Sequence, residues 1–267
     1  MIDRTSITNW RADHPWSRNS FVEQDMVICR ALVSIYSDPV LSGALAFRGG
    51  TALHKLFLRP QVRYSEDIDL VQIEPGPAKP IVERLDAALS WLPGKTFDSR
   101  RFGFRMRFKY ESEVPPVEQM RLKVEVNTYE HFTELGHVME PFRMENPWFS
   151  GECEVRTYAL DELLGTKLRA LYQRRKGRDL FDLSHAIEIG DVNDDAVLRC
   201  WRRYMTHGGK NAPSSIQFLE NMDEKLADGD YCSDVNMLLR PGNHFNPQDA
   251  YARIRQRYIL RIGSLFN

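Results

Sequence analysis

The sequence predicts an α+β protein whose strands lie in the first half of the chain and whose helices dominate the second. Residues 101–110 and 120–129 alternate polar and apolar side chains, which is the period of a strand with one buried face. From about residue 160 onward, apolar residues recur at helical spacing instead. Strands followed by helices are typical of this fold class, and we expect two parts, residues 1–150 and 151–267.

The composition is that of a globular protein with a buried core, since 42% of the 267 residues are hydrophobic and 27% are charged. The net charge of −1 excludes a uniformly basic nucleic-acid-binding protein, although it permits a local basic surface. The sequence contains neither a long apolar run nor an apolar signal segment, and its four cysteines are widely spaced. We therefore expect a cytoplasmic protein that has no membrane partner and no zinc site.

The elements predicted for the first half are short helices and strands, each recognised from its apolar spacing. In chain order they are a helix at 21–37, a buried strand at 44–49, a helix at 51–58, a strand at 65–73, a helix at 77–92, and the strands at 101–110 and 120–129. The two alternating strands are expected to form a hairpin across Pro115-Pro116. The proline-containing segment at 137–153 is expected to be irregular and to link the two halves.

The strand at 101–110 has one aromatic face and one basic face. The aromatic face begins at Phe102, and we interpret it as core because it fills the whole inward side of the strand. The basic face includes three candidate RNA-binding residues, Arg105, Arg107 and Lys109.

The second half is predicted to contain five helices, at 160–174, 179–189, 194–205, 214–227 and 249–263. Arg253, Arg257 and Arg261 share one face of the last helix. We interpret this face as the solvated side of an amphipathic helix, with an RNA backbone as the alternative contact.

A diglycine precedes the helix predicted at 51–58. Gly49 and Gly50 allow a close backbone approach, and the free N–H groups at a helix start favour a phosphate. Thr51 can cap the helix or contact the phosphate, and Lys55 follows one turn later. A glycine turn of this kind is more often structural when it stands alone.

Asp67 and Asp69 are two residues apart on a predicted strand, so their carboxylates share a face. Two such charges repel unless a cation lies near them, and oxygen ligands of this kind suit Mg²⁺ or Mn²⁺. Glu125, on the outward face of another strand, is a candidate third metal ligand. Acids that hold a metal beside a phosphate site predict phosphoryl or nucleotidyl transfer from a nucleoside triphosphate (NTP).

Two stretches carry a resemblance to a known family. GGTALHK at 49–55 with RYSEDIDL at 63–70, and KLRALYQRRKGRDLFDL at 167–183, resemble the two signatures of the AbiEii/AbiGii-type toxin nucleotidyltransferases. That family lies within the DNA polymerase β-like superfamily, so the resemblance implies a nucleotidyltransferase core followed by a helical region. It also implies a toxin of a toxin–antitoxin or phage-defence system, which is silenced by an antitoxin and adds nucleotides to the 3′ end of tRNA.

The resemblance assigns roles to individual residues. Residues that match the first signature and would bind the nucleotide are Gly49, Gly50, Thr51, Lys55, Arg63 and Ser65, with Asp67 and Asp69 as catalytic metal ligands. Lys167 matches the nucleotide-contacting lysine of the second signature. Asp179 and Asp182 match its acidic positions, and Asp179 is expected to act on the incoming hydroxyl. This chain has Gly-Thr where many relatives have Gly-Ser, and either hydroxyl can contact a phosphate.

The basic run within the second signature indicates a nucleotide or RNA phosphate surface. Its candidate RNA-binding residues are Arg174, Arg175, Lys176 and Arg178. Two alternatives remain open at this point. The same chemistry can serve a small-molecule or protein acceptor, or the chain can be a non-catalytic module that binds nucleic acid or the antitoxin.

Overall fold

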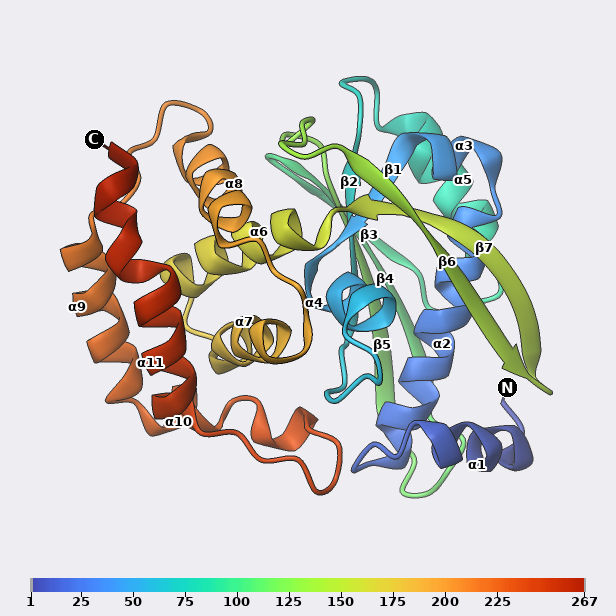
Figure 1. The fold of residues 1–267 in the computed structure, drawn as a ribbon. Coiled ribbons are helices and arrows are strands. Elements are labelled where there is room, and N and C mark those ends of the chain that lie inside the picture. Colours follow the sequence, from blue (N-terminus) through green and yellow to red (C-terminus); the bar gives the residue numbers. More distant parts are fainter. Residues whose placement is uncertain (1, 267) are drawn as a thin grey trace. The chain divides into compact units, whose positions relative to one another are not determined.

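The structure is a computed structural model that describes residues 2–266, and it divides into two compact units (Figure 1). The units are Met1–Tyr158 and Ala159–Asn267. Within the described residues, every strand belongs to the first unit, and the second is built from helices and their connections. This arrangement confirms the predicted α+β class with its helical C-terminal part. No helix in residues 2–266 has the length and apolar character needed to cross a membrane.

The first unit contains a seven-stranded mixed sheet with the order β3-β4-β5-β2-β1-β7-β6. Its strands are β1 (Leu45–Arg48), β2 (Asp67–Gln72), β3 (Thr96–Arg100), β4 (Gly103–Glu111), β5 (Gln119–Asn127), β6 (His137–Asn146) and β7 (Phe149–Tyr158). β2 pairs with β5 in parallel, and β1 pairs with β7 in parallel, whereas the other neighbours are antiparallel. The central strands therefore come from distant parts of the sequence.

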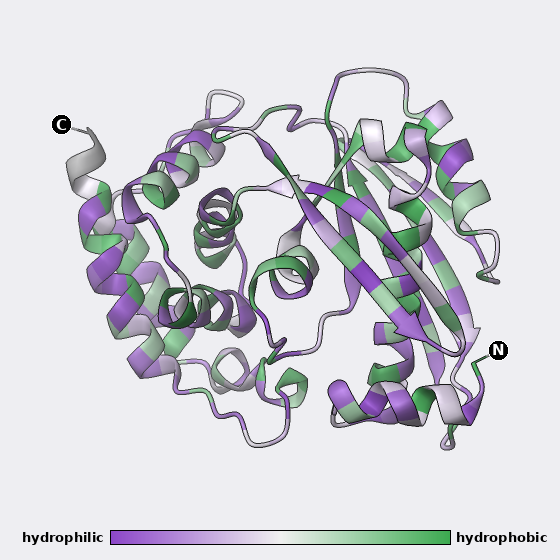
Figure 2. Ribbon diagram, turned by 45° about the vertical axis from the view of Figure 1, so that its right-hand side comes forward, coloured by the Kyte–Doolittle hydropathy of each residue, from purple (hydrophilic) through white to green (hydrophobic). Residues whose placement is uncertain are grey.

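The alternation predicted for β4 and β5 is present, and the two strands form the expected hairpin. Phe104, Met106 and Phe108 are buried, while the basic residues between them point to the other face. Figure 2 shows similar bands of hydrophobic and hydrophilic residues along the strands. The prediction was wrong for Phe102, which is 46% exposed because the chain turns at residues 101–102, before β4 begins.

The segment predicted to be an irregular linker is instead a long antiparallel hairpin, β6–β7 (Figure 1). Pro141 is tolerated because β6 is an edge strand, where a missing N–H interrupts no hydrogen bond to a further strand. At the turn, the side-chain oxygen of Asn146 accepts a hydrogen bond from the Trp148 N–H at 3.0 Å. Residue 150, the expected boundary between the two parts, lies within β7.

The helices of the first unit are α1 (Arg4–Asp13), α2 (Asn19–Tyr36), α3 (Pro39–Ala44), α4 (Gly49–Ala52), which continues as the π-helix η1 (Leu53–Phe57), and α5 (Lys79–Ala88). α2 is almost entirely buried, and its polar residues are bonded accordingly. Glu23 accepts backbone hydrogen bonds from Glu113 and Val114 at 2.7 and 3.1 Å. α2 thus fastens the β4–β5 loop while it covers the sheet.

The described residues of the second unit contain the five predicted helices, the last of them divided into α11 (Pro247–Arg257) and η3 (Ile259–Phe266), and two short additional ones, α10 (Gly229–Ser233) and η2 (Asn236–Leu238). The other four predicted helices are α6 (Leu160–Gln173), α7 (Gly177–Ile189), α8 (Asp194–Thr206) and α9 (Ser215–Leu226). The last predicted helix becomes a 3₁₀ helix after α11. Inside this unit, α6 packs closely on α8, and the buried Glu162 of α6 accepts a hydrogen bond from the hydroxyl of Tyr204 at 2.7 Å.

Candidate active site

The diglycine lies where β1 ends and α4 begins. Gly49 has a φ of +82°, a backbone conformation that L side chains rarely adopt. A Cβ atom at this position would lie 2.6 Å from Oδ2 of Asp69, which is too close for any side chain. Both the backbone conformation and the lack of space therefore require glycine here. The antiparallel pairing of Arg48 with Asp69 creates this contact. The structure therefore brings the predicted turn and the second predicted acid together.

Thr51 and Lys55 lie close to this turn in sequence, but their side chains are bonded elsewhere. The Thr51 hydroxyl donates to the backbone oxygen of Asp67 at 2.5 Å, which ties α4 to β2. Lys55 is buried, and its ammonium lies 2.5 Å from Oδ1 of Asp25 on α2. In this structure neither group is presented to a phosphate, contrary to the expectation from the sequence. Local spacing could not show this, because Asp25 lies on a different helix.

Asp67 and Asp69 point to the same face of β2, while Ile68 and Leu70 between and after them are buried. The parallel register places Lys123 of β5 opposite Asp67, and its Nζ lies 2.7 Å from Asp67 Oδ2. Burial raises the pKa of Asp67 above its ordinary value, the Lys123 ammonium opposes this rise, and the Asp69 carboxylate adds to it. Asp67 of the acid pair therefore forms an ion pair with Lys123, a residue that the sequence analysis had not assigned to the site.

Glu125 lies opposite Asp69 in the register, but it is bound by other residues. Arg105 donates to Glu125 Oε2 through Nε at 2.9 Å and Nη2 at 2.7 Å, and Lys123 Nζ lies 3.7 Å from the same oxygen. Throughout residues 2–266, no group of three or more acidic, histidine or cysteine side chains is arranged to hold a metal. The geometry therefore does not support Glu125 as a third ligand.

Asp67 and Asp69 nevertheless fit a hard divalent cation. Mg²⁺ is commonly held by one or two carboxylates, with water and substrate phosphates as its other ligands. Ser65, two residues before Asp67, is 4% exposed as a residue, and its hydroxyl has no hydrogen-bond partner within the described residues. Arg63 is buried too, and it donates to the backbone oxygen of Tyr64 at 2.9 Å. Two carboxylates that share one face of β2 are suited to a cationic ligand.

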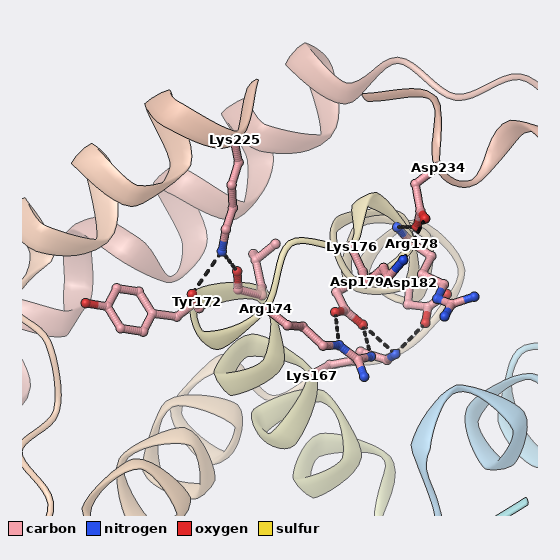
Figure 3. A network of polar contacts seen from close by, with 10 residues as sticks. Lys167, Tyr172, Arg174, Lys176, Arg178, Asp179, Asp182, Lys225 and Asp234 are labelled. Carbon is pink, nitrogen blue, oxygen red and sulfur yellow. Dashed lines mark hydrogen bonds and ion pairs between the residues drawn. The ribbon is translucent and has the colours of Figure 1, made fainter. Parts of the chain in front are cut away.

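The second signature forms a buried ion cluster within the helical unit (Figure 3). Lys167 of α6 lies 2.8 Å from Asp179 Oδ1 and 2.8 Å from Asp182 Oδ2, and both aspartates of α7 are fully buried. Arg174 donates to both oxygens of Asp179, each at 2.6 Å. Burial alone would raise the pKa of Asp179, but Lys167 and Arg174 outweigh it and hold that pKa below its ordinary value. Asp179 is therefore ionised, with both oxygens already bonded.

Most of the predicted RNA-binding residues lie in ion pairs. Arg107 lies 3.6 Å from Asp98, Arg175 lies 2.7 Å from Asp228, and Lys176 lies 3.7 Å from Asp234. The backbone N–H of Arg178 donates to Asp234 at 3.2 Å, whereas Lys109 is exposed on β4. Paired cations offer less charge to an RNA backbone than unpaired ones.

The arginines of the last predicted helix are paired in the same way. Arg253 contacts Glu188, Arg257 contacts Asp194 at 2.7 Å, and Arg261 contacts Asp194 at 3.7 Å. These pairs join α11 and η3 to α7 and α8 within the second unit. The structure thus favours a packing role for this face over an RNA-binding one.

A pocket of about 290 Å³ adjoins the acids of the first unit. Asp69 and Glu125 line it together with arginines and Phe102 from the β3–β4 turn. Sequence reasoning missed this arrangement, because it assigned Phe102 to the core and had no signal for the order of β3, β4, β5 and β2. The pocket gives the acids an adjoining space that a substrate can enter.

Solved structures, two of them described as nucleotidyltransferases, share the fold of this chain. MenT4, a nucleotidyltransferase toxin from Mycobacterium tuberculosis, matches with a TM-score of 0.64 and 17% identity, over 97% of this chain and 89% of that chain. JHP933 from Helicobacter pylori matches with a TM-score of 0.56 and 15% identity, over 94% of each chain. A putative nucleotidyltransferase from H. pylori matches with a TM-score of 0.55 and 14% identity, over 93% of this chain and 96% of that chain.

The family follows from the sequence itself. Residues 30–255 match the family described as the nucleotidyl transferase AbiEii toxin of type IV toxin–antitoxin systems. The chain therefore belongs to the AbiEii nucleotidyltransferase toxin family, and the resemblance found in its two signatures is confirmed. No match was found among curated proteins.

Proposed function

We propose that the protein transfers a nucleoside monophosphate from an NTP to RNA, with the 3′ acceptor end of tRNA as the acceptor. A modified acceptor end cannot carry an amino acid, so translation stops. The observation that carries this proposal is the close approach of the Asp69 carboxylate to Gly49, where it fills the space a Cβ atom would need, with Asp67 on the same face of β2. An anion-binding turn and a cation-binding acid pair thereby meet at one place.

Gly49 and Gly50 supply the phosphate-binding part of the site. Backbone N–H groups in a turn that includes a residue of positive φ can form a concave site for an anion, and Gly49 provides that residue. Without a side chain at Gly49, phosphate oxygens can approach both the backbone and the acids. The turn thus positions the triphosphate, which is most of what nucleotidyl transfer requires from a protein.

Asp67 and Asp69, whose carboxylates share one face of β2, would hold Mg²⁺ or Mn²⁺. A bound divalent cation neutralises charge on the triphosphate and lowers the pKa of an attacking hydroxyl. The Lys123 ammonium lies 2.7 Å from Asp67 Oδ2 and opposes the rise in the pKa of Asp67 that burial causes, because it favours the carboxylate over the carboxylic acid.

For the second signature, we propose that Lys167 contacts the nucleotide, as the family resemblance implies. Asp179 and Asp182 hold its ammonium from two sides. Because both oxygens of Asp179 are already bonded by Lys167 and Arg174, we assign Asp179 to the positioning of Lys167 and not to proton removal from the acceptor.

RNA is the acceptor that best fits the arginine-lined pocket beside Asp69. Phosphates favour arginine, which binds them with two parallel hydrogen bonds. The further partner is a cognate antitoxin protein, since the family consists of toxins of type IV toxin–antitoxin systems. Growth inhibition in the absence of the antitoxin follows from this assignment.

The test is to incubate the purified protein with each α-labelled NTP, Mg²⁺ and total RNA, with Asp67→Asn as the matched inactive variant. We expect label in tRNA, its loss in Asp67→Asn, and its loss when EDTA removes divalent metal. Label in protein or in small molecules would identify a different acceptor and overturn the RNA assignment. Transfer that persists in excess EDTA would exclude the metal–carboxylate site, and the absence of any transfer would favour a non-catalytic binding module.

A further inference from the structure

The pocket beside the acid pair has an aromatic side. Phe102, in the turn between β3 and β4, lines the pocket and is 46% exposed. Tyr129, which follows β5, is 37% exposed, and the centroids of the two rings are 4.6 Å apart. The two rings are tilted by 40° and both are partly open to solvent, so Phe102 presents an exposed aromatic ring at the pocket with Tyr129 against it.

Backbone hydrogen bonds hold these two rings in place. The Thr128 N–H donates to the backbone oxygen of Phe102 at 3.0 Å, which fixes the β3–β4 turn against the end of β5. The side-chain oxygen of Asn127 accepts from the N–H groups of Tyr129 and Glu130 at 2.9 and 2.8 Å. Because both segments are fixed, a ligand that stacks there orders little additional chain.

Arg101 differs from the other arginines that line the pocket, because they are paired with carboxylates. Of the four arginines that line the pocket, Arg48 pairs with Glu130, Arg100 with Asp98, and Arg105 with Glu125. Within residues 2–266, no carboxylate partner is recorded for Arg101. Its guanidinium carbon lies 4.9 Å from the centroid of the Phe102 ring. A cation over an exposed ring, with no carboxylate partner within residues 2–266, is suited to a ligand with both an aromatic part and a phosphate.

We infer that Phe102, backed by Tyr129, and Arg101 form a subsite for one unstacked nucleotide, whose base stacks on Phe102 and whose phosphate pairs with Arg101. This subsite deepens the proposed function and rests on it. The nucleotide has two possible sources, the incoming NTP and the terminal nucleotide of the acceptor RNA. Both have the same chemistry, a base and a phosphate.

The test measures binding of two probes to the full chain: radiolabelled NTPs with Mg²⁺, and a short single-stranded RNA ending in CCA. The variants are Phe102→Ala, Phe102→Trp and Arg101→Gln. Stacking on an aromatic residue contributes to base binding by roughly 5- to 150-fold, so Phe102→Ala should weaken binding of one probe within that range. Phe102→Trp should retain binding, and Arg101→Gln should weaken the same probe as Phe102→Ala and reduce its salt dependence.

Phe97→Ala is the matched control, since Phe97 is 51% exposed on β3 but does not line the pocket. Weaker NTP binding in Phe102→Ala identifies the triphosphate as the occupant, and weaker RNA binding identifies the acceptor end. Unchanged binding of both probes, or an equal loss in Phe97→Ala, overturns the subsite.

The two proposals fail in different ways. If Phe102→Ala binds and transfers normally while Asp67→Asn is inactive, the subsite is wrong and the nucleotidyltransferase function stands. If the wild-type protein transfers nothing but Phe102→Ala still binds a probe more weakly than Phe97→Ala, the subsite stands without the proposed reaction.

Discussion

The ammonium of Lys123 lies 2.7 Å from Oδ2 of Asp67, so a side chain of β5 brings a positive charge to the acid pair of β2. The same ammonium lies 3.7 Å from Glu125, on the face that also carries Asp69. Without this charge, several carboxylates on one face would repel one another. A divalent cation bound by Asp67 and Asp69 relieves the same repulsion, so Lys123 and a metal act on the same carboxylates.

This relationship predicts that Lys123→Met makes folding stability more dependent on divalent metal. Without metal, we expect the variant to lose up to about 1 kcal/mol, because the Lys123–Asp67 pair is partly exposed. Added Mg²⁺ should raise its melting temperature more than that of the wild type, since metal binding to the folded state is stabilising. Thermal unfolding across a MgCl₂ titration measures this. Lys79→Met, which removes the exposed Lys79–Glu83 pair, is the control, and an Mg²⁺ response equal to that of wild type in Lys123→Met would contradict the prediction.

Gly49→Ala should abolish transfer and destabilise the protein by about 1–3 kcal/mol, as strained backbone positions generally do. The new Cβ would meet Oδ2 of Asp69 at 2.6 Å, in a conformation with a φ of +82°. Denaturant unfolding and transfer assays on the same samples test both effects. Gly136→Ala separates them, because Gly136 has a φ of +86° but no atom within 4 Å of its Cβ position. If Gly136→Ala lost transfer to the same extent as Gly49→Ala, the contact with Asp69 would not be the cause.

Lys167→Met should be strongly destabilising as well as inactive. Removal of one partner from a buried ion pair costs about 3–5 kcal/mol, and Lys167 faces two fully buried aspartates. Chemical denaturation measures this loss, and growth inhibition has to be scored together with the amount of folded protein. Lys176→Met removes a half-exposed lysine 3.7 Å from Asp234 and should cost much less. Equal stability of the two variants would contradict the arrangement in Figure 3.

The lowered pKa of Asp179 predicts how the folding stability of the protein changes in acid. Its pKa in the folded state lies below the ordinary value of 3.8, so the folded state binds the proton less readily than the unfolded chain. The stabilisation is therefore complete above the unfolded-state pKa and is lost as the pH falls through the folded-state pKa. Asp179→Asn should be less stable at neutral pH and should show a shallower loss of stability below about pH 4. If the free energy of unfolding falls with decreasing pH equally steeply in the wild type and in Asp179→Asn, this account is wrong.

The sequence predicts the parts of the site that depend on local periodicity. Alternation places Asp67 and Asp69 on one face, and helical spacing places Asp179 and Asp182 together on α7. Two signatures in the expected order were enough to recognise the family. Each of these inferences requires only neighbours along the chain.

The remaining features depend on which distant segments meet. Local pattern does not reveal that β5 pairs with β2 and places Lys123 opposite Asp67, or that Asp25 of α2 binds Lys55. The hairpin β6–β7 was missed because Pro141 signals irregular structure, whereas an edge strand accepts it. Phe102 was misplaced because alternation does not show the residue at which a strand begins. In each case, the position or partner of the residue depends on tertiary structure, which the local sequence pattern does not reveal.

Pro141 also affects how copies of the protein meet in a crowded solution. It lies on β6, at one end of the strand order, where exposed amide and carbonyl groups can template a strand from another molecule. Pro141 has no N–H group to donate to a strand from another molecule. The exposed charges of Arg143 and Glu145 make pairing with such a strand less favourable. These features of β6 therefore disfavour edge-to-edge aggregation through this strand.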